Sequence, residues 1–260
     1  MKRISIFLAL LALFFTDLAL AAGAIATSIT GTVQVQTGPS SAKPVRQGDE
    51  VRQGDTIFTA GNSSAVLKFD DGQIIALTSN SRMTVTAYQY NPATESGNVL
   101  LSLVTGGMRA ITGLIGRRTP SQVAYRAATA TIGIRGTDGT IATNGTDVVV
   151  TVTDGVMTLT QGNLVLTISA GEAVFTRPGQ QPIRGSIASV LAQLPPAFAA
   201  AIAQSGALDG QVNDARNRGG NDNRGGDDRG NGRGDGQGSG QQGGSQGGGT
   251  GGGGRNASGN

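Results

Sequence analysis

The sequence offers few side chains for covalent or metal chemistry. It contains no His and no Cys in 260 residues. Ser-His-Asp triads, Cys-His pairs, disulfides and His- or Cys-containing zinc sites therefore cannot be built within this chain. Carboxylates remain, but no pair of them stands in surroundings that would raise a pKa for acid–base catalysis. The composition predicts a protein that is not an enzyme and binds no cofactor.

The most conspicuous carboxylates stand directly before glycines. Asp70-Asp71-Gly72 and Asp154-Gly155 both separate runs of apolar residues. Asp and Gly at such positions are typical of tight turns. Calcium binding through the same oxygens is the alternative, but EF-hand spacing is missing. We interpret these residues as turn formers and predict no metal site.

Arginines surround a Gly-rich segment in the middle of the chain. Arg109 lies within residues 106–116, and these are followed by Arg117, Arg118 and Arg126. Acidic glycans or phosphate groups would suit such a stretch, but a solvated loop is the favoured interpretation. The net charge of +3 comes with no concentrated basic patch, which argues against nucleic acid as a partner. Arg109 is a candidate binding residue.

Two tyrosines give a second tentative binding surface. Tyr88 and Tyr90 alternate with other residues and are predicted to share one strand face with Thr84 and Thr86. An exposed stripe of this kind binds partners, whereas a packed or half-buried face is the more ordinary outcome. Both interpretations stay open from the sequence.

The N-terminal residues carry a targeting pattern. Lys2 and Arg3 precede an apolar run over residues 4–15, and Ala19-Leu20-Ala21 fits the small-x-small cleavage rule. The run is too short to span a membrane. We expect a signal peptide over residues 1–21 and a chain that is exported and not membrane-spanning after cleavage.

The remaining chain divides by composition. Residues 210–260 contain 21 of the 43 glycines and no Phe, Tyr, Trp, Ile or Leu. Such a segment buries too little apolar area to offset its conformational entropy. We therefore predict a β domain over residues 22–184, a short helical segment over 185–208 and a disordered Gly-rich tail over 209–260. Two short helices are expected in the helical segment, the first with Ser186 as N-cap.

Period-two alternation dominates the predicted domain. Residues 65–69 and 83–90 alternate apolar and polar side chains, and residues 147–153 and 156–160 are predicted to be separate strands joined at Asp154-Gly155. Helical periodicity is missing before residue 186. The fold class is all-β, a single twisted domain that is either solenoid-like or a sandwich.

One segment combines a half-buried strand with a single charge. In residues 130–139, Ile132 and Ile134 alternate with polar residues, and Arg135-Gly136-Thr137 follows. We expect Arg135 to pair with a turn carboxylate such as Asp71, or to bond backbone carbonyls, and so hold two β layers together. Contact with a partner is the alternative role.

Several of these motifs together resemble the FecR domain family. Phe69 to Gly72 resembles its Phe-x-Asp-Gly turn, residues 103–109 its Leu-x-x-Gly-x-x-Arg segment, and residues 134–137 its Val-Arg-Gly-Thr element. The resemblance covers roughly residues 29–180. The structural signature it selects is Asp71, Gly72, Ile134, Arg135, Gly136 and Thr137.

The family is found outside the cytoplasmic membrane of bacteria, so the resemblance implies an envelope or extracellular module. Its founding regulators carry an anti-sigma segment and a membrane helix before this domain, whereas a signal peptide is expected here. The resemblance favours a non-catalytic protein-interaction or signalling module, periplasmic, secreted or at the cell surface of a Gram-negative bacterium. Its partner would be an envelope or extracellular protein. The alternative is a structural surface protein, such as an adhesin or matrix component. The oligomeric state stays open.

Overall fold

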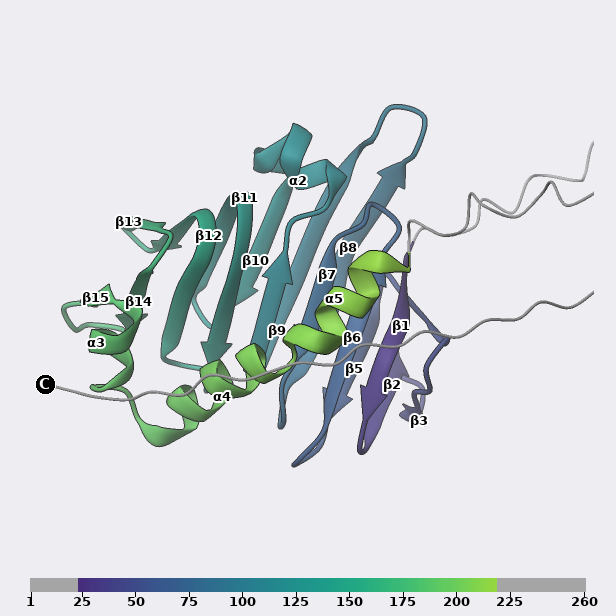
Figure 1. Ribbon diagram of the computed structural model, residues 1–260, viewed down its shortest axis with the longest axis horizontal. Helices are drawn as coiled ribbons and strands as arrows, with labels where there is room; N and C mark the ends of the chain where they lie inside the picture. Colours follow the sequence, from purple (N-terminus) through teal and green to yellow (C-terminus); the bar gives the residue numbers. More distant parts are fainter. Residues whose placement is uncertain (1–22, 219–260) are drawn as a thin grey trace, which may run out of the picture. The chain divides into compact units, whose positions relative to one another are not determined.

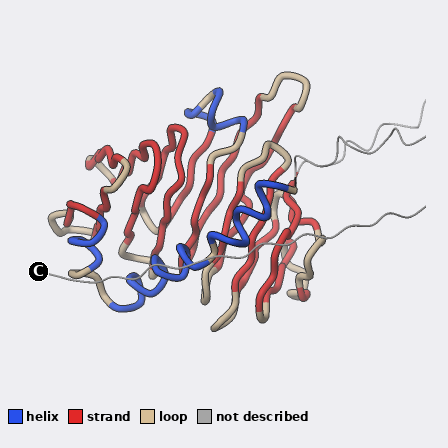
Figure 2. Tube along the Cα trace, viewed as in Figure 1, coloured by secondary structure: helices blue, strands red, loops and turns tan. Residues whose placement is uncertain are grey.

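The described part of the computed structural model runs from residue 23 to residue 218 and is built mainly from β-strands (Figures 1 and 2). This confirms the all-β prediction. The predicted signal peptide and the part of the predicted tail from residue 219 onward lie outside the described residues.

Fifteen strands form one mixed sheet. In chain order they are β1 (Gly23–Thr30), β2 (Val33–Thr37), β3 (Lys43–Pro44), β4 (Glu50–Arg52), β5 (Asp55–Thr59), β6 (Ser64–Phe69), β7 (Ile74–Leu77), β8 (Arg82–Asn91), β9 (Ser96–Ile111), β10 (Val123–Ala127), β11 (Ala130–Thr143), β12 (Val148–Gln161), β13 (Leu164–Ser169), β14 (Glu172–Thr176) and β15 (Ile183–Ser186). The β9–β10 pair is parallel and the other pairs are antiparallel.

Three long strands fold this sheet into two layers. The first parts of β9 and β11 pair with β10, and their second parts pair with each other. β12 likewise pairs with β13 through its second half and with β14 through its first half. One layer therefore contains β4, β1, β6, β7, β14, β15 and one half of each long strand. The other contains β3, β2, β5, β8, β10, β13 and the remaining halves.

The main hydrophobic core lies between the two layers. Leu67, Ile75 and Val150 from the first layer pack in one cluster with Tyr125 and Leu159 from the second. Period-two alternation explains this packing, because every second side chain of each strand points to the same interior. Of the two arrangements that the sequence left open, the chain adopts the layered one.

The outer face of the first layer is covered by helices (Figure 1). They are α3 (Ile187–Leu191), α4 (Pro196–Ala207) and α5 (Asp209–Asn217). Val190 and Phe198 pack on Val149 and Phe175, and Val212 packs on Val66. We call this layer the helix-covered layer and the other the open layer.

The helix predictions were confirmed in part. Ser186 caps α3, since its Oγ accepts a hydrogen bond from Ser189 N at 3.2 Å. Residues 209–217, expected to begin the tail, instead form α5. The apolar spacing of Val212 and Ala215 allows this segment to bury one face against the sheet. The boundary of the Gly-rich segment therefore moves past residue 217.

Candidate functional site

Residues 134–137 of the predicted signature lie at the corner where β11 passes from one layer to the other. The register between β11 and β12 shifts between Arg135 and Asp138. Gly136 has a φ of 60°, which favours glycine. Opposite it, a Cβ on Gly155 would lie 2.1 Å from the Gly136 carbonyl oxygen. The expected turn at Asp154-Gly155 is wrong: β12 continues through these residues, and the two strands bend together.

Buried hydroxyl groups stabilise the same corner. The Thr112 and Thr137 side chains lie 3.1 Å apart, and the Thr137 N–H donates to Thr112 Oγ1 at 2.8 Å. Thr112 returns a hydrogen bond to the Thr137 carbonyl at 3.0 Å. Ile134, three residues before Thr137 in the strand, points into the main core. The signature therefore supplies a bend, its hydrogen bonds and its core anchor.

Arg135 does not have the role expected for it. Its side chain is exposed, and among the described residues it makes no ion pair or side-chain hydrogen bond. Asp71, its expected partner, is fully buried inside the molecule. The strand alternation explains the difference, because Ile134 occupies the interior and its neighbour must face solvent.

Asp71 instead belongs to a buried polar cluster between the layers. Its N–H donates to Tyr88 Oη at 3.0 Å, and Tyr88 Oη donates to Asp71 Oδ1 at 3.3 Å. Gln73 N donates to the same carboxylate at 3.1 Å, and Tyr125 Oη donates to Gln73 Oε1 at 2.8 Å. The cluster joins the β6–β7 turn of the helix-covered layer to β8 and β10 of the open layer. It performs the layer-to-layer connection that was assigned to Arg135.

The chain also places this carboxylate at the start of the short helix α2 (Leu114–Arg118). Leu114 N donates to the Asp71 carbonyl at 2.8 Å, and a Cβ on Gly113 would lie 2.2 Å from Asp71 Oδ2. Burial raises the pKa of Asp71, and its hydrogen bonds offset only part of that effect. Gly72 has a φ of 79° and closes the turn through a bond from its N–H to Phe69 O, which confirms the predicted tight turn.

The tyrosines do not form an exposed stripe. Tyr88 is buried and packs near Phe69 with ring centroids 4.9 Å apart. Tyr90 is half-buried against the main core. A register shift between Val85 and Ala87 reverses the alternation of β8, so the tyrosines face inward while the preceding threonines face outward. The prediction of a shared face was therefore wrong.

Arg109 is likewise structural rather than a solvated loop residue. It lies in β9 and forms a bidentate pair with Asp138 at 2.7 and 2.9 Å. It also contacts Asp209 at the start of α5, and Arg216 of α5 contacts Asp138 at 3.2 Å. The bonds to Asp138 and Asp209 raise the pKa of Arg109. The contacts of Arg109 with Asp209 and of Arg216 with Asp138 attach α5 to the sheet. The other predicted basic residues are dispersed over α2 and β10.

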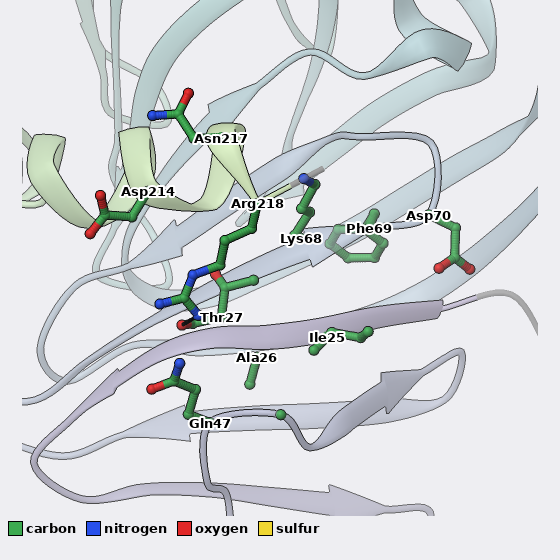
Figure 3. A pocket seen from close by; sticks show the side chains of 11 residues that line it. Ile25, Ala26, Thr27, Gln47, Lys68, Phe69, Asp70, Asp214, Asn217 and Arg218 are labelled. Carbon is green, nitrogen blue, oxygen red and sulfur yellow. Dashed lines mark hydrogen bonds between the residues drawn. The ribbon is translucent and has the colours of Figure 1, made fainter. Parts of the chain in front are cut away.

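A groove of about 1230 Å³ lies between β1, β6 and the end of α5 (Figure 3). Its two cations are engaged with backbone carbonyls: Lys68 Nζ donates to Ala215 O at 2.9 Å, and Arg218 donates to Thr27 O at 3.3 Å. These contacts compensate the carbonyl end of the helix and extend its attachment to the sheet. Among the described residues that line the groove, both cations therefore already donate to backbone carbonyls, and neither is left to bind a ligand.

The outer face of the open layer is left uncovered by helices α3 to α5. A cross-strand row runs over it, and the members of this row are Thr56, Thr84, Ser102, Arg126, Thr131, Thr160 and Val165. Arg82 and Arg135 share this face. None of these described residues is Asp or Glu. This row is thus rich in hydroxyl groups, and together with Arg82 and Arg135 it carries positive charge.

Some structural residues could not be singled out from the sequence. Gln73 and Tyr125 lie beside or within apolar strands, and both side chains are buried. A buried polar group needs a hydrogen-bond partner. This requirement is the signal from which the two residues could have been identified. The two residues are 52 positions apart, and no local pattern pairs them.

Comparison with known proteins matches the described corner and polar cluster to one family. Residues 55–158 match the family model described as FecR protein. The chain carries a FecR domain. The matched segment begins at β5 and ends within β12, so it contains Asp71, Gly72 and the residues 134–137. The resemblance stated from the sequence is confirmed over this segment.

No curated protein matches the chain. Two solved structures of a "putative anti-sigma factor" from Parabacteroides distasonis ATCC 8503 are similar at 12% and 13% identity, each with a TM-score of 0.42. Each match covers 50% of this chain, and the chain spans 59% of the length of those chains.

At the level of the family, FecR domains are regulatory rather than catalytic and are associated with the cell envelope. Between residues 23 and 218 no group of His, Cys, Asp or Glu residues has the arrangement of a metal site. Within the same range no helix is long and apolar enough to cross a membrane.

Proposed function

We propose that this FecR-domain chain is an exported, non-catalytic interaction module that binds an envelope or extracellular protein through the outer face of its open layer. The observation that carries the proposal is the difference between its two outer faces. Helices α3 to α5 cover one of them, whereas the described chain leaves the other uncovered.

The chemistry of the open face indicates the kind of partner. Arg126 and Arg135 have no ion-pair partner among residues 23–218, and Arg82 lies over the Phe58 ring at 5.2 Å. Hydroxyl groups between them donate and accept hydrogen bonds. A protein surface carrying carboxylates complements this face, and the charge would accelerate association at low salt.

Affinity capture with the full chain, followed by identification of the bound proteins, tests the proposal. The same capture is repeated with Arg126→Glu combined with Arg135→Glu. The matched control is Arg46→Glu, because Arg46 is exposed and lies between β3 and β4, outside the strands of the open face. Circular dichroism and a melting curve establish that all variants are folded.

We expect an envelope or extracellular protein to be captured by the unmodified chain and by Arg46→Glu, and to be lost with the double reversal. Binding should weaken as salt increases. Equal capture by all three proteins would contradict the assignment of the open face. Capture of secreted matrix components in place of a signalling protein would favour the alternative role as a structural surface protein.

A further inference from the structure

The folded sheet has four free edges in the described part of the chain, and one of them differs from the others. The edges are β3, β4, β13 and β15. An unpaired edge is a template for adding another strand, and proteins normally protect it with short strands, proline or charge. The protection is visible at three edges: β3 has only Lys43 and Pro44, β4 carries Glu50 and Arg52, and β15 is short and carries Arg184.

Strand β13 carries none of these devices. Its six residues, Leu164–Ser169, include no charged residue and no proline. Val165 is 62% exposed and is the most exposed large apolar side chain between residues 23 and 218. Leu164 and Leu166 point to the core side and are only half-buried, and no further strand covers them. In Figure 1 β13 lies at the margin of the sheet. It also lies outside the segment that matches the FecR family.

We propose that β13 pairs with β13 of a second copy of this chain, in an antiparallel arrangement that continues the open layer across a two-fold axis. The proposal does not require the protein partner proposed above, because its hydrogen bonds use the edge of the sheet, although Val165 lies both on this edge strand and in the outer-face row.

The hydrogen-bonding side of each β13 residue follows from two observations. Gly162 and Asn163 form a two-residue hairpin loop, so Leu164 pairs with Gln161 at its base. Ser169 N donates to Glu172 at 2.9 Å and is therefore not bonded to β12. Since N–H groups alternate along a strand, those of Val165 and Thr167 point toward the free edge.

These positions favour a register centred on Leu166 over one centred on Thr167. Opposite residues in an antiparallel pair lie on the same face, so a two-fold axis must pass through a residue of β13. An axis at Thr167 would use the Ser169 N–H, which is already bonded to Glu172. An axis at Leu166 pairs Val165 with Thr167 of the other copy, and symmetry repeats that hydrogen-bonded pair.

The same register is favourable for the side chains. Leu164 would face Ile168 of the other copy, and Leu166 would face its own counterpart, so the half-buried leucines become more fully buried. The two Leu166 residues form a pair without mutual hydrogen bonds, with a Cα separation of about 4.5 Å. Each copy contributes only the residues of one short strand to the contact, whereas each partner of a stable complex contributes about 20 residues. We therefore expect a weak, concentration-dependent dimer.

Single cysteines test both the pairing and the register, because the chain has no cysteine of its own. A Cα separation of about 4.5 Å lies within the range for disulfides, so Leu166→Cys should give covalent dimers under mild oxidation. Leu164→Cys is the matched control on the same face of the same strand. Its two copies would lie about 14 Å apart, too far to bridge.

Sedimentation of the full chain at concentrations up to about 1 mM measures the dimer directly. We expect Val165→Lys to abolish the dimer, because it places two like charges near the axis. Val104→Lys should retain it, since Val104 is also exposed but belongs to a strand that is paired on both sides. A chain that remains monomeric at the highest concentration, or cysteine variants that cross-link equally, would overturn the proposal.

Discussion

The corner between the two layers should tolerate a methyl group on one of its glycines and not on the other. Gly136 and Gly155 have φ values of 60° and 76°, so an alanine at either position costs about 1–2 kcal/mol in backbone conformation. A Cβ on Gly136 would meet nothing within 4 Å. On Gly155 it would lie 2.1 Å from the Gly136 oxygen and 2.9 Å from the Arg135 oxygen.

The contact at Gly155 involves backbone atoms, so no side-chain rotation relieves it. The two strands would have to separate by about 1 Å, which is comparable with overpacking a core and adds about 1–3 kcal/mol. Gly155→Ala should therefore cost about 2–5 kcal/mol, a large fraction of the roughly 5–15 kcal/mol that stabilises an ordinary domain. Gly136→Ala should lower the free energy of unfolding only by the cost of the backbone conformation, about 1–2 kcal/mol.

Urea unfolding of the full chain measures the difference. Gly162→Ala is a second control, because Gly162 has a φ of 57° and a Cβ there would meet nothing within 4 Å, yet it lies in the hairpin turn away from the corner. Gly136→Ala and Gly162→Ala should agree with each other and differ from Gly155→Ala. Equal losses of unfolding free energy in all three variants would show that the close approach of the two strands at Gly155 does not determine the stability of the corner.

Three further predictions concern the buried groups. Tyr125→Phe should lower the free energy of unfolding by about 1–3 kcal/mol, because it leaves Gln73 Oε1 buried without its donor; urea unfolding measures this. Arg109→Lys should destabilise less than Arg109→Ala but more than a surface substitution, since lysine loses the bidentate geometry toward Asp138; melting temperatures that match the unmodified chain would contradict this. Burial raises the pKa of Asp71, so the folded state holds its proton more tightly than the unfolded state does; stability should fall as pH rises from about 3.8 through the raised pKa, and Asp71→Asn should remove that slope in unfolding curves measured across this range.

Local signals predicted the strands and several turns. The sequence Val-Arg-Gln-Gly-Asp occurs twice in succession, at residues 45–49 and 51–55. Asp49 and Asp55 each accept a hydrogen bond from the N–H three residues earlier, both at 2.8 Å. Such an interaction needs only neighbours in the sequence, so residue type and spacing are sufficient to predict the turn. The Ser186 cap of α3 was predictable for the same reason.

The functional assignments failed where they depended on which face a residue occupies. One extra residue near Ala87 turns Tyr88 inward. The residue pattern of β8 does not predict this register shift. Arg109 was assigned to a loop because glycines surround it, although β9 continues through them. Its partner Asp138 lies 29 residues away and is brought to it by strand pairing.

The sequence by itself determined the β class, several of the tight turns, the absence of His and Cys chemistry and the family of the central segment. These properties follow from residue type and short-range spacing. The tertiary structure decided that the signature is a corner, that Asp71 rather than Arg135 connects the layers, and that β13 is left unprotected. Each of these depends on contacts between strands that are distant in the sequence, and register between strands is set by the packing of the whole core.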